Sequence, residues 1–190
     1  SNNSEVKIMW ALVESGNVSK IYTHPKQLTI GDVNYPSNIF SMWTSSELEA
    51  IGIYEVVIDN TNYKDKEYYI NTDQSFAFGS GKVTATYGTA TARALADLKT
   101  NHCAVIDHQA YELLQPNDWM VVKATETSGT VASDWTTYRA GVRTAANDMK
   151  TKINAVSDVD ALAALYVYNN ANPPVRPLGE FPESPDEDSD

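Results

Sequence analysis

The stretch Asn117–Arg143, NDWMVVKATETSGTVASDWTTYRAGVR, contains two Asp-Trp pairs sixteen positions apart, Asp118-Trp119 and Asp134-Trp135. Each aspartate stands at the predicted start of a helix, where a carboxylate accepts backbone N–H groups and complements the helix dipole. We therefore expect both aspartates to cap helices and both tryptophans to be large anchors of the hydrophobic core. On this interpretation the stretch is the turn of a helical hairpin.

Two arginines follow the second pair. Arg139 and Arg143 lie one helical turn apart, so they share a face of the predicted helix. They are placed to pair with Asp118 or Glu126 across the hairpin, and a bidentate arginine–carboxylate link would fix the angle between the two helices. Tyr138, beside Arg139, belongs to the same brace. Because the stretch supplies no nucleophile or base, we prefer this structural interpretation to a catalytic one.

Helical periodicity extends on both sides of this stretch and predicts an α-helical module over residues 89–168. Pro116 interrupts the upstream helix, and Ser157 with Asp160 has the spacing of a capping box for a short final helix. The predicted apolar stripe of the long downstream helix is Trp135, Tyr138, Val142, Ala146, Met149 and Ile153.

The first part of the chain, residues 1–88, predicts a small antiparallel β-rich module. Apolar runs on either side of Gly16-Asn17 indicate a hairpin in which these two residues adopt positive φ. Ser46 and Glu49 fit a capping box for one short helix. Gly79-Ser80-Gly81 predicts a second hairpin turn rather than a phosphate loop, because strands flank it on both sides.

The last part, residues 169–190, is rich in proline and ends in the acidic run ESPDEDSD. The prolines exclude a regular helix, so we expect an extended arm that orders on a partner, followed by a solvated tail. The fold class is therefore α+β: a β-rich module, an α-helical hairpin module and an extended Pro-rich acidic tail.

Composition excludes several classes of function. The 190-residue chain carries a formal net charge of −11, which disfavours binding to nucleic acid. No apolar run approaches the ~20 residues that cross a bilayer, and no signal peptide is recognisable, so we expect a soluble protein without a membrane partner. The single cysteine, Cys103, excludes an intrachain disulfide. His102 and His108 lack the spacing of a metal pair.

The sequence therefore predicts no catalytic residue, no metal site and no cofactor, and we interpret the chain as a protein that is not an enzyme. One alternative stays open. Tyr63, Tyr68 and Tyr69 lie in a loop rich in Asn and Asp, a composition that suits stacking on a sugar. The same residues equally suit the edge of a small sheet.

The helical stretch also resembles the helical module of tailed-bacteriophage tail assembly chaperones and related small proteins of the tail-fibre region. Those proteins carry a Leu-Leu, an Asp-Trp and then a Trp-x-x-Tyr-Arg-x-x-Leu/Val-Arg element. The matching residues here are Leu113, Leu114, Asp118, Trp119, Trp135, Tyr138, Arg139, Val142 and Arg143. The opening MWALVESGNVSKIY, with IGIYEVV, is similar to the N-terminal module of many marine and cyanobacterial phage proteins.

The resemblance implies a non-enzymatic phage protein that acts through protein–protein contacts, in virion assembly or as a minor virion component. The implied partner is a phage tail or tail-fibre protein, and the implied location is the virion or the host cytoplasm during assembly. Self-association stays open. The alternative is a receptor- or carbohydrate-binding tail module that uses the loop of residues 63–69.

Overall fold

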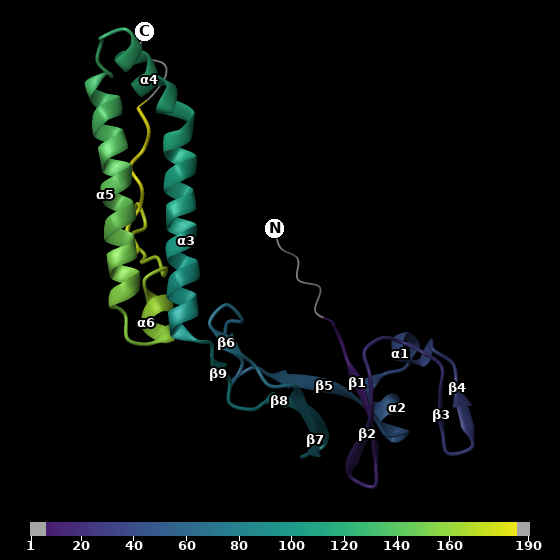
Figure 1. The fold of residues 1–190 in the computed structure, drawn as a ribbon. Coiled ribbons are helices and arrows are strands. Elements are labelled where there is room, and N and C mark those ends of the chain that lie inside the picture. The colour runs from purple at the N-terminus through teal and green to yellow at the C-terminus, as the bar shows by residue number, and fades with distance from the viewer. Residues whose placement is uncertain (1–6, 186–190) are drawn as a thin grey trace. The chain divides into compact units, whose positions relative to one another are not determined.

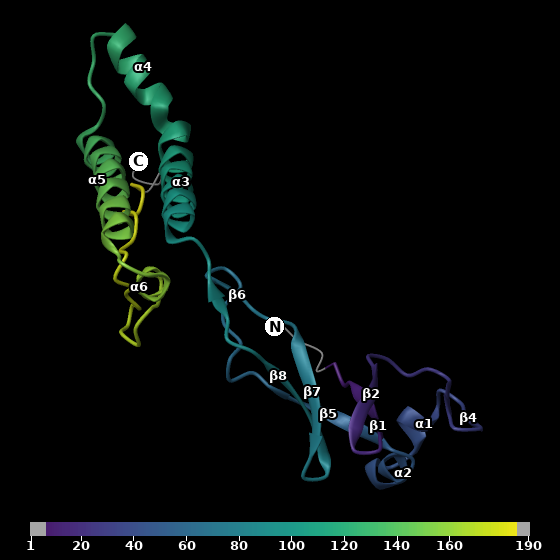
Figure 2. The same cartoon turned by 60° about the horizontal axis from the view of Figure 1, so that its bottom comes forward.

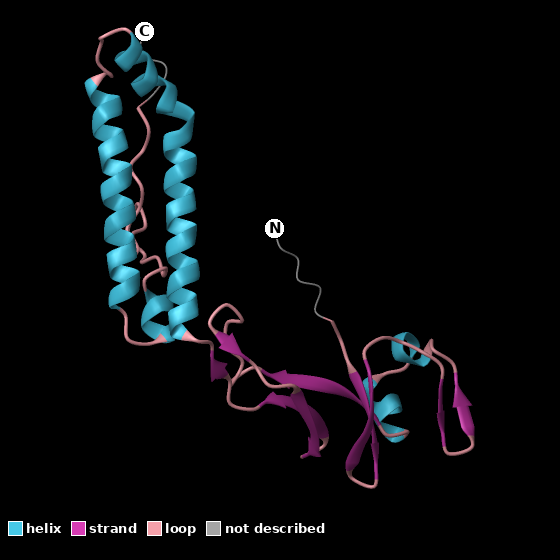
Figure 3. Cartoon of the chain, in the orientation of Figure 1, coloured by secondary structure: helices cyan, strands magenta, loops and turns pink. Residues whose placement is uncertain are grey.

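The computed structural model describes residues 7–185 of the chain. It divides into two compact units with the boundary between Thr91 and Ala92, and each unit is described by itself. The unit before the boundary holds most of the strands, and the unit after it is helical (Figure 3). The α+β fold class predicted from the sequence is confirmed.

The first unit is built on a five-stranded sheet with the order β2-β1-β5-β8-β7 (Figure 1). Its strands are β1 (Trp10–Glu14), β2 (Asn17–Tyr22), β5 (Ile53–Asp59), β7 (Gln74–Gly79) and β8 (Lys82–Tyr87). The neighbouring strands pair antiparallel except for β5 and β8, which run parallel. The prediction of an antiparallel module is therefore wrong for this one pair, because the chain crosses over between β5 and β8 by way of β6 and β7.

Shorter elements complete this unit. They are the hairpin of β3 (Leu28–Ile30) and β4 (Val33–Tyr35) and the helices α1 (Ile39–Met42) and α2 (Ser45–Ala50). Two strands have only two residues each, β6 (Tyr69–Ile70) and β9 (Thr91–Ala92), and β9 spans the boundary between the units. The sequence predicted α2 but not α1, β3 or β4. The hydrophobic core between the sheet and the two helices consists of Trp10, Leu12, Tyr22, Leu28, Ile39, Phe40, Leu48 and Ile53.

Two local predictions in the first unit are corrected. The turn of the β1–β2 hairpin places positive φ at Ser15 and Gly16, while Asn17 already belongs to β2. The capping box of α2 is formed by Thr44 and Glu47 instead of the predicted pair two residues further on. The predicted turn between β7 and β8 is confirmed, with positive φ at Ser80 and Gly81.

The second unit is a helical hairpin. Its elements are α3 (Leu95–Leu114), the 3-10 turn η1 (Gln115–Asn117), α4 (Asp118–Glu126), α5 (Ser133–Ala155) and α6 (Val159–Ala164). Figure 2 shows α4 following α3 and the loop that leads back to α5. Pro116 stands in η1 and ends α3 as predicted, since proline cannot donate to the helical ladder. The N-cap of α6 is Asp158, whose carboxylate accepts from Ala161 N at 2.7 Å, rather than the predicted serine.

The apolar stripe predicted for α5 forms the core of this unit. Tyr138, Val142, Ala146, Met149 and Ile153 are all buried, and Trp135 at the head of the stripe is half-buried. On α3, the residues that face inward are Leu98, His102 and Ile106. Among residues 7–185, none of the helices combines the length and the apolarity needed to cross a bilayer.

The Pro-rich arm packs against its own helical unit. Leu178 is only 1% exposed, and its N–H donates to Leu165 O at 2.9 Å. Lys152 on α5 donates its ammonium group to Pro177 O at 2.9 Å, and Arg176 lies over the ring of Tyr168. The arm is visible beside α5 in Figure 1. The arm contains no helix, as predicted, but it is ordered on its own helical unit and not only on a partner. Residues 186–190 of the acidic tail lie outside the described part.

Candidate functional site

The most distinctive polar cluster of the helical unit is built around Arg139, whose side chain is 8% exposed. Its Nη2 donates to Asp118 Oδ1 at 2.6 Å, and its Nη1 donates to Leu114 O at 3.0 Å and to the side-chain oxygen of Asn117. Asn117 in turn donates to Leu113 O at 2.9 Å. One guanidinium on α5 therefore donates to a carbonyl at the end of α3 that has no partner within its helix. The same guanidinium pairs with Asp118, the first residue of α4.

The predicted ion pair between Arg139 and Asp118 is confirmed, but one Nη2–Oδ1 hydrogen bond joins them in place of the predicted bidentate link, and Tyr138, Arg143 and Glu126 take no part in it. Arg143 is exposed, and within residues 7–185 its recorded hydrogen bond is a long one, 3.4 Å, to Arg139 O. Glu126, at the far end of α4, makes no ion pair with either arginine in the described chain. Sequence reasoning missed Asn117, although the proline before it signals an interrupted helix whose backbone groups need other partners.

Neither aspartate caps a helix in the predicted way. Asp118 is the first residue of α4, and its carboxylate pairs with Arg139 instead of accepting helical N–H groups. Asp134 lies in the first turn of α5 and accepts from the N–H of its neighbour Trp135 at 2.8 Å, a contact that does not cap the helix. Both carboxylates still lie at helix N-termini, where their charge complements the helix dipole.

The two tryptophans differ in burial. Trp119 is 57% exposed, so the prediction that it anchors the core is wrong, whereas Trp135 is half-buried and packs edge-on against Tyr138 with centroids 5.7 Å apart. Both indoles line one open hollow of about 270 Å³ at the turn between α4 and α5. Its other lining residues are Met120, Lys123, Ala124, Thr127, Thr130, Val131 and Ala132.

The hairpin tip, which we define as residues 117–135, exposes large apolar side chains beside the charged side chains of Lys123, Glu126 and Asp134. α4 has no buried residue, and Trp119, Val121 and Val122 are all exposed. Lys123 lies over the Trp119 ring at 5.9 Å from its centroid. The charge of Asp118 is already matched by Arg139. The tip therefore exposes aromatic and aliphatic side chains among a few charges, and a partly buried polar brace holds the start of α4.

The tyrosines of the alternative sugar site do not form a shared platform. Tyr68 is only 6% exposed, the Lys64 ammonium lies 4.3 Å from the centroid of the Tyr69 ring, and Tyr63 packs against Tyr87 with centroids 5.0 Å apart. Stacking on a sugar needs an open ring face, and Tyr68 offers none because its side chain is buried.

Cys103 and His102 are potentially reactive, but both side chains have a structural environment in the helical unit. Burial raises the pKa of the Cys103 thiol, and the nearby Asp107 charge adds to the effect, so the thiolate is scarce at neutral pH. His102 is buried and shares a hydrogen bond of 2.7 Å between its Nδ1 and the Tyr166 hydroxyl. Across residues 7–185, no group of three or more His, Cys, Asp or Glu side chains is arranged to hold a metal ion.

Comparison with known proteins found no family model, no curated protein and no solved structure that matches this chain.

Proposed function

We propose that this chain is a non-enzymatic bacteriophage protein of the tail or tail-fibre region and that it binds a tail protein through the hairpin tip. One observation carries the proposal: α4 has no buried residue, yet it exposes Trp119, Val121 and Val122. A nine-residue helix gains little stability by itself, so such a helix depends on tertiary contacts. Trp119 and Val122 lie about one turn apart on α4, and an exposed aromatic and aliphatic pair of this type is typical of interaction sites.

The geometry of the tip favours recognition of a protein. Tryptophan is among the residues that contribute most to protein–protein interfaces, and its burial on a partner is worth about 2 kcal/mol or more. The brace between Arg139 and Asp118 holds the start of α4 before a partner arrives. Less conformational freedom is then lost on binding, which favours affinity.

The resemblance to phage tail proteins points to the partner. The residues that carry it include Asp118 and Trp119 of the tip and Arg139 of the brace. On this proposal the protein acts in the virion or in the host cytoplasm during assembly. The net charge of −11 supports a protein partner over nucleic acid.

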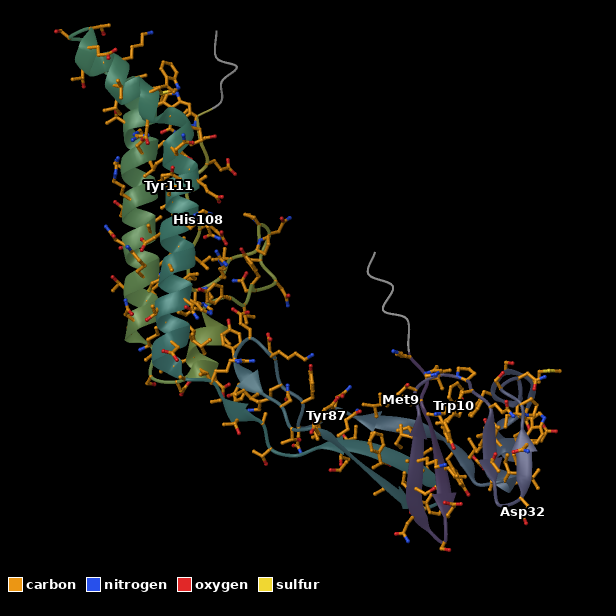
Figure 4. The ribbon with its side chains drawn as sticks, turned by 45° about the vertical axis from the view of Figure 1, so that its right-hand side comes forward. Met9, Trp10, Asp32, Tyr87, His108 and Tyr111 are labelled. Carbon is orange, nitrogen blue, oxygen red and sulfur yellow. The ribbon has the colours of Figure 1, made fainter. Side chains whose placement is uncertain are left out.

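Cross-linking in phage-infected cells tests the proposal. A lysine-reactive cross-linker applied to the full chain is expected to join Lys123, which lies beside Trp119, to a protein of the tail or tail-fibre region. The Trp119→Ala variant should lose that cross-link. The matched control is Tyr111→Ala, because Tyr111 is an equally exposed aromatic residue on α3, outside the tip (Figure 4).

Cross-links from Lys123 that reach no tail-region protein would overturn the proposal. Equal loss of the cross-link in Trp119→Ala and Tyr111→Ala would contradict the assignment of the surface to α4. Mass spectrometry of purified particles then separates the two modes of action: a permanent component is retained in particles, and an assembly factor is absent from them.

A further inference from the structure

Strand β5 changes its partners along its length. Its first residues, Ile53 to Glu55, pair with β1 on one edge, and its last residues, Val56 to Asp59, pair with β8 on the other edge. On the β1 edge, the pairing ends with one hydrogen bond from Val56 N to Met9 O at 2.9 Å. Within residues 7–185, no strand pairs with residues 57–59 on that edge. Figure 4 marks Met9 and Trp10, where β1 begins.

The backbone pattern shows which groups this open edge offers. Gly52 O and Val56 N both bond toward β1. Backbone groups of alternate residues in a strand point to the same edge, so the N–H and C=O of Ile58 point to the edge that β1 has left. Those of Val57 point to β8. Ile58 therefore presents a donor and an acceptor side by side, the arrangement that one residue of an antiparallel strand satisfies.

The side chains at the open edge are apolar. Val57 is 49% exposed and Ile58 is 43% exposed, and successive residues of a strand lie on opposite faces of the sheet. Exposed sheet edges in proteins are usually protected by lysine, proline, a bulge or a covering element, because they template pairing with other chains. The run Val56-Val57-Ile58 contains no lysine or proline, and its pairing with β8 keeps a continuous register.

A fixed carboxylate ends the edge. Asp59 Oδ1 accepts from Thr61 N at 2.9 Å and from the Thr61 hydroxyl at 2.5 Å. These hydrogen bonds lower the pKa of Asp59, which keeps the group ionised and oriented at the end of the strand. A strand that pairs with residues 57–59 therefore meets an anion beside two apolar side chains.

Charge decides between the occupants of this edge. If two copies paired antiparallel around Ile58, Asp59 of each copy would stand opposite Val57 of the other, and two chains of net charge −11 would approach each other. A segment with an apolar residue opposite Ile58 and a basic residue opposite Asp59 avoids both problems: the carboxylate of Asp59 faces a cation, and the partner need not carry the same negative charge.

We propose that the open edge of β5 at residues 57–59 binds an extended, basic-flanked apolar segment of another protein as an added antiparallel strand. The mode is β-strand addition, in which main-chain hydrogen bonds give affinity and alternate side chains give specificity. It rests on the geometry of the first unit alone and is independent of the hairpin tip. The chain then has two binding sites, one in each unit.

Nuclear magnetic resonance of the ¹⁵N-labelled full chain tests this proposal with a capped peptide, Thr-Thr-Arg-Val-Val-Thr, in which an antiparallel strand with the first Val opposite Ile58 has its Arg opposite Asp59. The peptide is expected to shift the amide signals of Val57, Ile58 and Asp59 and to slow hydrogen exchange at Ile58. The same peptide with Glu in place of Arg should bind about fivefold more weakly, because the charge attraction is lost.

Two variants make the result specific. Ile58→Pro removes the N–H that points to the open edge and leaves the N–H of Val57, which points to β8, in place. An edge strand tolerates proline at such a position, so binding should fall by about tenfold with an unchanged circular dichroism spectrum. Asp59→Asn keeps an acceptor for Thr61 but removes the charge, so the preference for the Arg peptide over the Glu peptide should disappear.

Three results would overturn the proposal. The first is slow hydrogen exchange at Ile58 before any peptide is added, which would mean that the edge is already occupied. The second is a set of shifts that leaves residues 57–59 unchanged. The third is equal affinity of the peptide for the Ile58→Pro variant and the unaltered chain.

Discussion

The shaft and the tip of the helical hairpin follow the same sequence pattern but are used differently. In the shaft, which we define as α3, residues 136–155 of α5 and the docked arm, Met149 and Ile153 are almost fully buried. In the tip, the equally apolar Trp119 and Val122 are exposed. This difference shows that apolar residues at helical spacing form a core only where a second helix or chain segment packs against them. Four substitutions test this comparison, beginning with the largest expected effect.

Ile153→Ala should have the largest effect on stability. The side chain is completely buried on α5, so truncation leaves a cavity in the shaft. We expect a loss of about 2–5 kcal/mol in the free energy of unfolding, measured by urea denaturation. The control is Asn147→Ala on the exposed face of the same helix, which should change stability by less than about 0.5 kcal/mol. Equal effects of the two variants would contradict the assignment of the shaft as core.

Leu178→Ala tests whether the arm belongs to the shaft. We expect a loss in the lower half of the same range, about 2–3 kcal/mol, because the arm has room to adjust around the shortened side chain. Limited proteolysis should cut the arm faster in this variant than in the unaltered chain. An unchanged cleavage rate and an unchanged free energy of unfolding would show that the arm is not held by Leu178.

Arg139→Met tests the brace between shaft and tip. The substitution keeps the apolar part of the side chain but leaves Leu114 O and the buried Asn117 side chain without their donor. We expect a loss of about 1–3 kcal/mol in the free energy of unfolding. Arg143→Met is the matched control, since that arginine is exposed and outside the brace. A stability loss as large in the control would remove the special role of Arg139.

The sequence predicted the helices of the shaft but not the docking of its arm, and it predicted the tip in part. The helical period of Tyr138, Val142 and Ile153 was sufficient to predict which face of α5 is buried, because a long amphipathic helix packs its apolar face against the core. The link between Arg139 and Asp118 was predicted because the two residues carry opposite charges on helices expected to be neighbours.

Other features depended on tertiary neighbours that a sequence pattern does not reveal. Asp118 had two available roles, helix cap or ion-pair partner, and the position of Arg139 decided between them. Trp119 lies on a helix of nine residues that meets too little of the molecule to be buried. The docking of the arm rests on Leu178 and on carbonyls that accept from Lys152, a set of contacts without periodicity.

The same contrast holds in the first unit. The β1–β2 and β7–β8 hairpins were predicted because turn residues separate two apolar runs. The parallel pairing of β5 with β8 was not, since a crossover connection leaves no local signal in the sequence. The open edge of β5 follows from that pairing, so it becomes visible only in three dimensions.

The free energy of unfolding of Trp119→Ala tests most directly the central claim that the tip is exposed contact surface and the shaft is core. Urea denaturation of the variant and the unaltered chain should give values within about 0.5 kcal/mol of each other, as expected for an exposed side chain. A loss of about 3–5 kcal/mol would mean that the indole is a buried anchor and would contradict the account.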